Sequence, residues 1–245
     1  MKPDWKLSAC TVSDGPALAR NNIPAFYNDP STSWALLWPE GMELNFLIEQ
    51  SAKRQARNLL RNREFLRHQK ATDPDTGGVV GYARWVLPTG RFPTSNGDGR
   101  STPPSCPCPW EEAQVPAVSA DGEMRFTRQA EAAWWSPRGD MYGMDDEIHA
   151  VMERVIADAA YIKLDYLAVH PSKQGQGIAT TLVKSGLQFA DKHSVPVFTI
   201  AFKAARGIYA RLGFREVARV VQDLARYGGF GEYTTYLMVR DAPGV

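Results

Sequence analysis

Residues 167–179, with the sequence LAVHPSKQGQGIA, connect an apolar run to a glycine-containing turn and then to an amphipathic segment. Pro171 has no N–H to donate to a neighbouring strand, so we expect the strand to end before it. Gly175 and Gly177 permit backbone conformations that other residues avoid, and they let a ligand approach the main chain closely. From Ile178 onward apolar residues recur at helical spacing, which predicts a helix that begins at this turn.

A turn at the start of a helix is suited to bind phosphate groups. The first N–H groups of a helix have no acceptor within the helix, and the positive end of the helix dipole lies beside them. Together they stabilise an anion by about 0.3–1 kcal/mol per exposed charge. The turn is therefore a candidate site for a pyrophosphate group.

Two other phosphate-binding motifs fit these residues poorly. A P-loop has lysine and serine or threonine after its last glycine, where this chain has Ile178 and Ala179. A dinucleotide-binding fingerprint has a third small residue where Thr180 stands, and an acidic residue after the next strand, which residues 197–201 do not supply. A plain strand-to-helix connection, with glycines that serve only close packing, is the remaining alternative.

The turn also matches a family pattern. Gln174, Gly177 and Ala179 follow the form Gln/Arg-x-x-Gly-x-Gly/Ala after a strand of the form Leu-x-Val-x-Pro. In this the chain resembles the GNAT superfamily of acyl-CoA-dependent N-acetyltransferases, whose signature turn binds the pyrophosphate of coenzyme A. A second block, residues 205–214 (ARGIYARLGF), resembles the family's next helix with its tyrosine. The resemblance is clear over residues 161–217, and residues 164–167 (LDYL) are similar to fungal-type small-amine members.

The resemblance implies a fold of the α/β (α+β) class. It is the GNAT fold, a mixed, mostly antiparallel twisted sheet flanked by helices, with central parallel strands at 161–169 and 197–201 that splay apart to admit acetyl-CoA. Periodicity predicts further strands at 7–12, 65–70, 79–87, 215–224 and 234–240, and helices from Ser13 toward Phe26 and at 44–60, 144–159 and 204–212. A chain of 245 residues with 44% hydrophobic residues fits a single domain over 1–245.

A segment rich in proline, glycine and serine interrupts this order at about residues 89–121. We expect a long surface loop insertion there, and its composition predicts little buried apolar area. The formal net charge of +1 gives no electrostatic reason to expect a nucleic-acid partner. Cys106 and Cys108 are too close together for a usual zinc half-site, so no metal is expected. No apolar run approaches the ~20 residues of a membrane span, so we expect a cytoplasmic protein without membrane contact.

Acyl transfer to an amine needs a proton acceptor for the amine, an N–H donor for the oxyanion and a proton donor near the sulfur. The resemblance places Tyr209 against the thioester sulfur, where a phenol can protonate the departing thiolate; the alternative is a tyrosine that only packs. It also implies that acetyl-CoA contacts a set of main-chain and turn residues. These are Leu167, Ala168, Val169, Gln174, Gly175, Gln176, Gly177, Ile178, Ala179 and Thr180, together with Tyr209.

The proton acceptor is open between three interpretations. Asp165 lies two residues before Leu167, so strand alternation predicts that both share one face, and burial there is expected to raise the pKa of Asp165 into a useful range. A purely structural carboxylate at this position is the alternative. His149, on the helix before this strand, is the second candidate base.

The acceptor substrate is less constrained than the acetyl donor. Aromatic residues outside the cofactor motif suit small amines, and residues 26–30 with 37–39 resemble the amine-side segment of small-molecule GNAT enzymes. We therefore expect acetyl transfer from acetyl-CoA to a primary amine of a small molecule, by direct attack in a ternary complex. Protein or peptide N-acetylation, and a non-catalytic acyl-CoA-binding module, are the alternatives.

Overall fold

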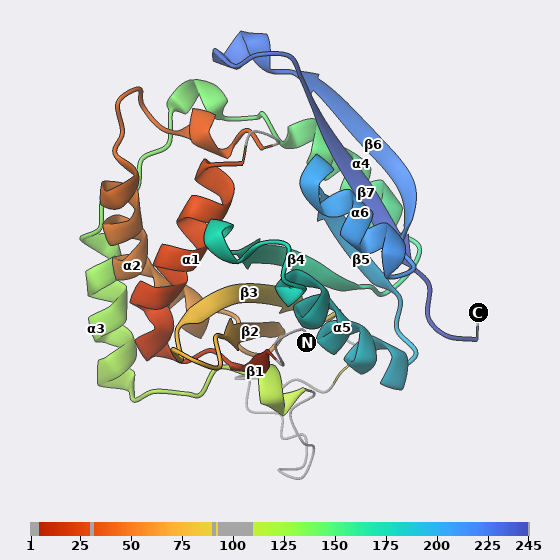
Figure 1. Ribbon diagram of the computed structural model, residues 1–245, viewed down its shortest axis with the longest axis horizontal. Helices are drawn as coiled ribbons and strands as arrows, with labels where there is room; N and C mark the ends of the chain where they lie inside the picture. Colours follow the sequence, from red (N-terminus) through yellow and green to blue (C-terminus); the bar gives the residue numbers. More distant parts are fainter. Residues whose placement is uncertain (1–4, 30–31, 90–91, 93–109, 245) are drawn as a thin grey trace.

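The computed structural model describes residues 5–29, 32–89, 92 and 110–244 (Figure 1). Within these residues seven strands form one sheet in the order β1-β2-β3-β4-β5-β7-β6. The strands are β1 (Lys6–Ala9), β2 (Leu66–Thr72), β3 (Val79–Val86), β4 (Ile162–Val169), β5 (Val197–Ala201), β6 (Arg215–Asp223) and β7 (Glu232–Arg240). Only β4 and β5 pair in parallel, and the other neighbours are antiparallel. The predicted mixed, mostly antiparallel sheet is confirmed.

Helices cover both faces of this sheet. They are α1 (Gly15–Tyr27), α2 (Leu44–Leu60), α3 (Ala120–Glu131), α4 (Asp146–Ile156), α5 (Ile178–Lys192) and α6 (Lys203–Arg211). Both α1 and α5 contact β3 and β4, but they use alternate residues of β3: Ala83 and Trp85 belong to the core beneath α5, whereas Tyr82 packs with Leu18 of α1. Because neighbouring strand residues point to opposite faces, α1 and α5 lie on opposite sides of the sheet. Figure 1 shows α2 and α3 grouped beside α1.

Two glycines let α5 lie close against the sheet. A Cβ at Gly81 of β3 would lie 2.5 Å from Cγ2 of Ile178, the first residue of α5. A Cβ at Gly186, two turns along α5, would overlap the ring of Trp85, which is fully buried. The missing side chains therefore set the height of α5 above β3 and β4, and with it the position of the turn that precedes the helix.

Replacing Gly186 with alanine is expected to lower the free energy of unfolding by about 1–3 kcal/mol, the usual cost of overpacking a close-packed core. Gly207→Ala is the matched control, since Gly207 is an exposed helical glycine whose nearest neighbour to a new Cβ is Arg211 Nη1 at 3.4 Å. Alanine there should stabilise by up to about 1 kcal/mol through helix propensity. Denaturant unfolding measures both changes, and a gain in stability from Gly186→Ala would contradict the packing described.

The segment predicted as a surface loop differs from the structure at its C-terminal end. Residues 93–109, which include Cys106 and Cys108, lie outside the described residues. Residues 110–115 are not a surface loop: Trp110, Ala113 and Val115 are buried, and the Trp110 ring stacks on Phe189 of α5 with 4.7 Å between centroids. The loop boundary at residue 121 is therefore wrong, because the aromatic and aliphatic residues after 109 join the core.

Helix α3 follows this buried segment, although the sequence analysis predicted no helix there. Its start carries recognisable signals: the Ser119 hydroxyl accepts a hydrogen bond from the N–H of Gly122 at 3.2 Å, and Asp121 and Glu123 occupy the first turn.

Candidate active site

The two parallel strands at the centre of the sheet separate along their length. Only three residue pairs join them, from Ile162 opposite Val197 to Leu164 opposite Thr199, although β4 continues to Val169. At the last of these pairs, the Thr199 hydroxyl donates a hydrogen bond to the carbonyl of Leu164 at 3.0 Å. Beyond it, no strand in the described part of the chain pairs with this edge of β4. The predicted splay of the central strands is present.

The open edge of β4 presents main-chain groups to the gap. In an antiparallel pair, alternate residues direct both their N–H and their C=O toward the partner strand. The His170 N–H donates to the carbonyl of Val80 at 3.2 Å. Every second residue before His170, such as Ala168, therefore directs its main-chain N–H and C=O toward β3. Leu167 and Val169 therefore direct their main-chain groups into the gap between β4 and β5. Of the three strand residues predicted to contact acetyl-CoA, Leu167 and Val169 face this edge, and the Val169 carbonyl accepts a hydrogen bond from Gln174 Nε2 at 3.4 Å.

The turn before α5 forms an open cradle. Gly175 and Gly177 have φ values of 76° and 87°, in the left-handed region that glycine adopts readily. A Cβ built on either glycine would meet no atom within 4 Å, so the space over the turn is open. Buried Trp5 holds the turn from behind, since its Nε1 donates to the carbonyl of Gln176 at 3.1 Å.

The first N–H groups of α5 are directed toward this space. Thr181 donates to the carbonyl of Gly177 at 3.0 Å, which is a normal helical hydrogen bond. The N–H groups of Ile178, Ala179 and Thr180 precede it and have no acceptor within the helix. Because these donors, the dipole and the open glycines share one location, the residues present fit a pyrophosphate. Their contact with coenzyme A stays a prediction.

Tyr209 of α6 lies at the point where the strands separate. Its side chain is 3% exposed and lines one cavity together with Leu164, Leu167 and Thr199. Burial raises the pKa of Tyr209 to about 12, although a hydrogen bond with Thr199 acts in the opposite direction. The phenol is therefore protonated at neutral pH. Thr199 is not among the site residues predicted from the sequence; its signal is a lone polar residue in the otherwise apolar strand 197–201.

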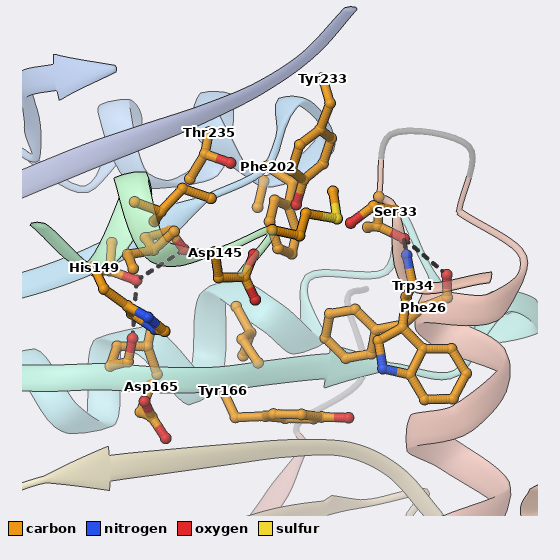
Figure 2. A pocket seen from close by; sticks show the side chains of 18 of the residues that line it. Phe26, Ser33, Trp34, Asp145, His149, Asp165, Tyr166, Phe202, Tyr233 and Thr235 are labelled. Carbon is orange, nitrogen blue, oxygen red and sulfur yellow. Dashed lines mark hydrogen bonds between the residues drawn. The ribbon is translucent and has the colours of Figure 1, made fainter. Parts of the chain in front are cut away.

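The cavity beside Tyr209 has a volume of about 310 Å³. It lies between α4, β4, β5, β7 and the segment around residues 26–37, and Figure 2 shows its lining. Five aromatic side chains besides Tyr209 contribute to the wall: Phe26, Trp34, Tyr166, Phe202 and Tyr233. Asp145, the residue before α4, and His149, one turn into α4, also line the cavity. Residues four apart on a helix share one face, so both reach the same space.

Asp165 is not on the face of β4 that the sequence analysis predicted. Arg84 of β3 is opposite Tyr166, but Trp85 is opposite Leu164, so Asp165 is the extra residue of a β-bulge. The bulge interrupts the alternation of side chains that the prediction assumed. In Figure 2 the Asp165 carboxylate is directed toward β3, although Asp165 lines the same cavity as Asp145 and His149. There Asp165 Oδ2 accepts from Arg84 Nε at 2.7 Å.

The expected rise in the pKa of Asp165 is also wrong. Burial alone raises the pKa of this carboxyl, but the charges and hydrogen bonds of Arg84 and Lys163 outweigh it and hold the pKa below its ordinary value. The Lys163 ammonium lies 3.0 Å from Asp165 Oδ1. Asp165 is therefore a carboxylate at neutral pH with a low affinity for a proton, because two cations stabilise its charged form.

Among the described residues, no three His, Cys, Asp or Glu side chains are grouped so that they could hold a metal ion. None of the helices in the described chain combines the length and the apolar composition that crossing a bilayer requires.

Comparisons with known proteins identify the architecture. Residues 125–223, which include the turn and Tyr209, match the family model of the acetyltransferase (GNAT) domain. No curated protein matches the chain in sequence.

Three solved structures share the fold at low sequence identity. A structure titled histone acetyltransferase HPA2 and related acetyltransferase, from Corynebacterium glutamicum, has a TM-score of 0.55 and 16% identity, with 98% of this chain and 99% of that chain covered. The C-terminal condensation domain of Ebony has a TM-score of 0.55 and 11% identity. Arylalkylamine N-acetyltransferase 2 from Aedes aegypti has a TM-score of 0.50 and 12% identity. Each of these two alignments covers 98% of this chain and 99% of the other chain. The chain has the GNAT fold, and residues 125–223, which carry the turn and Tyr209, match the family model of the acetyltransferase (GNAT) domain.

Proposed function

We propose that this protein transfers an acetyl group from acetyl-CoA to a primary amine of a small molecule, by direct attack in a ternary complex. The observation that carries the proposal is the gap between β4 and β5. An open anion-binding turn precedes α5, which packs on β4, and an aromatic cavity lies where the strands separate, with the protonated phenol of Tyr209 in its wall. These are the two binding regions and the proton donor that acyl transfer from a nucleotide-linked thioester needs.

Acetyl-CoA is proposed to bind along the open edge of β4. Its pyrophosphate would accept hydrogen bonds from the N–H groups of the turn, residues 174–180. The amides of its pantetheine arm would pair with the main-chain groups of Leu167 and with the N–H of Val169, as an added strand pairs with a sheet edge. This placement directs the thioester toward Thr199 and Tyr209, where the cavity begins.

The reaction then follows from the groups around the thioester. A neutral amine in the cavity attacks the carbonyl carbon, and a β4 N–H donates to the oxyanion that forms. The carbon–sulfur bond breaks, and Tyr209 protonates the departing thiolate. Direct attack is favoured because no cysteine lines the cavity in the described chain, and Cys10, which burial gives a raised pKa, belongs to the α1 side of the sheet.

The proton that the amine loses is proposed to go to His149. Asp165, the first candidate, is turned toward Arg84 and has a lowered pKa, so it is a poor acceptor at neutral pH. His149 lines the cavity from α4 (Figure 2). Imidazole is the side chain most often used to accept a proton near neutral pH. We propose that Asp165 instead fixes Arg84, whose guanidinium lies 5.6 Å from the centre of the Tyr166 ring.

A small-molecule acceptor is supported by the aromatic lining and by two structural neighbours. The protein from Aedes aegypti is an arylalkylamine N-acetyltransferase, and the Ebony domain was solved with beta-alanyl-dopamine. The neighbour from Corynebacterium glutamicum is named a histone acetyltransferase and related acetyltransferase, so a peptide acceptor belongs in the test.

The test is to mix the protein with acetyl-CoA and a panel of small primary amines and lysine-containing peptides. Thiol release is followed with time, and mass spectrometry identifies the acetylated product. We expect thiol and N-acetylated small amine in equal amounts. Acetylation of peptides alone would establish the protein-acetyltransferase alternative, and binding of acetyl-CoA without any product would establish a non-catalytic module.

A further inference from the structure

We propose that the acceptor is an aromatic primary amine that enters the cavity as a cation, with its ammonium group held by Asp145 and its ring between the aromatic walls. This inference rests on the proposed function and names its substrate class. It is drawn from the charge and the aromatic surface of the cavity lining, two features that acetyl transfer by itself does not require.

Asp145 is the carboxylate that gives the cavity its negative charge. The lining contains two carboxylates, Asp145 and Asp165, and the second is neutralised by Arg84 and Lys163. None of the ion pairs found among the described residues involves Asp145. No lysine or arginine lines the cavity in that part of the chain. A cationic ligand would therefore meet an uncompensated negative charge at this position.

The side chain of Asp145 does not cap its own helix. Asp145 is the N-cap residue of α4, and an aspartate there normally accepts hydrogen bonds from the next N–H groups of its own helix. The Asp145 side chain makes no such bond. Figure 2 shows its carboxylate turned away from α4 and into the cavity. A side chain that gives up the usual cap is available to bind a ligand instead.

The walls around this carboxylate suit a flat, weakly polar group. Phe26 and Tyr166 lie with ring centroids 4.9 Å apart on one side, and Phe202 and Tyr233 lie 5.7 Å apart on another. Aromatic rings favour ring ligands through offset and edge contacts, and their faces also attract an ammonium group. An apolar cavity of roughly 150 Å³ holds benzene. A cavity of about 310 Å³ therefore has room for one ring with a short amine-bearing chain.

The position of His149 completes the sequence of events. An ammonium group cannot attack a carbonyl carbon until it loses a proton. His149 lies one helical turn after Asp145 on the same face of α4, so the proton has an acceptor close to the carboxylate that holds the cation. Asp145 thus acts in binding and His149 in the proton transfer.

The test measures binding by calorimetry to protein saturated with coenzyme A, which forms a ternary complex without turnover. The probes are 2-phenylethylamine, its neutral isostere 2-phenylethanol, and spermidine, a cation without a ring. Asp145→Asn is expected to weaken 2-phenylethylamine roughly 10–100-fold, the worth of a charge-assisted hydrogen bond, and to leave 2-phenylethanol unchanged. Asp146→Asn is the matched control, since Asp146 is the next residue and does not line the cavity. Spermidine should bind more weakly than 2-phenylethylamine.

Three results would overturn the inference. They are equal affinity of the parent and Asp145→Asn for 2-phenylethylamine, tighter binding of spermidine than of the aromatic amine, and no binding of any amine to the parent. Failure of the proposed function gives a different result. In that case 2-phenylethylamine binds in an Asp145-dependent way, but no N-acetylated product forms when acetyl-CoA replaces coenzyme A.

Discussion

Tyr209→Phe is expected to lower the turnover number roughly 10²–10⁴-fold, the usual worth of one positioned proton donor. The affinity for acetyl-CoA should change little, because phenylalanine keeps the buried ring that packs 5.5 Å from Phe214 and removes only the hydroxyl. The measurement is the turnover number and the KM for acetyl-CoA at saturating amine. Tyr236→Phe is the control, since Tyr236 of β7 lies outside the cavity lining.

The pH dependence follows from the pKa of the same phenol. Because burial raises the pKa of Tyr209 to about 12, the phenol stays protonated when the pH rises from neutral to about 10. Ionisation of Tyr209 should therefore cause no fall in the turnover number over that range. A Tyr209→Phe variant with the parent rate at every pH would show that water or another group protonates the sulfur, and that Tyr209 is a packing residue.

Gly177→Val is expected to weaken coenzyme A binding at least about 100-fold, which corresponds to about 2.8 kcal/mol. Valine at a φ of 87° is strained, and its side chain would occupy the open space over the first turn of α5, where the pyrophosphate is proposed to lie. Calorimetry with coenzyme A measures the affinity, and circular dichroism checks that the fold is retained.

A second glycine separates the loss of the site from the strain of the substitution. Gly228, in the connection between β6 and β7, has a φ of 82° and equally open space around it. Gly228→Val therefore carries the same backbone strain but should bind coenzyme A as the parent does. Unchanged affinity in Gly177→Val, or an equal loss in Gly228→Val, would contradict the assignment of the turn.

The elements that local sequence determines were predicted well. Helix α5 begins at Ile178, as the glycines and the apolar spacing predicted, because a turn and a helix start depend on neighbouring residues. The family resemblance supplied the order of the two parallel strands and their separation. The end of the predicted loop was wrong, because residues 110–115 follow a segment rich in proline and serine, and only the tertiary packing of Trp110 on Phe189 shows that they are core.

The electrostatics of the site depend on partners far apart in the chain. Arg84 is 81 residues before Asp165, and the bulge that turns the carboxylate toward it leaves no local sequence signal. The burial of Asp165 could therefore be expected from the sequence, but the two cations that oppose its effect on the pKa could not. The same holds for Asp145. From the sequence it is an acidic residue at the start of a helix, and only the fold shows that its side chain lines a cavity.

The central claim is that acetyl-CoA and the amine meet where β4 and β5 separate. It is tested most directly with a conjugate in which coenzyme A is joined through an acetyl group to 2-phenylethylamine, whose affinity is compared with that of coenzyme A by calorimetry. If one molecule can occupy the turn and the aromatic cavity together, the conjugate should bind at least about 100-fold more tightly than coenzyme A, since the second contact becomes intramolecular. Gly177→Val should weaken the binding of both ligands, whereas Asp145→Asn should leave the gain unchanged, because the nitrogen of the conjugate is an uncharged amide. A conjugate that binds no more tightly than coenzyme A would contradict a shared site.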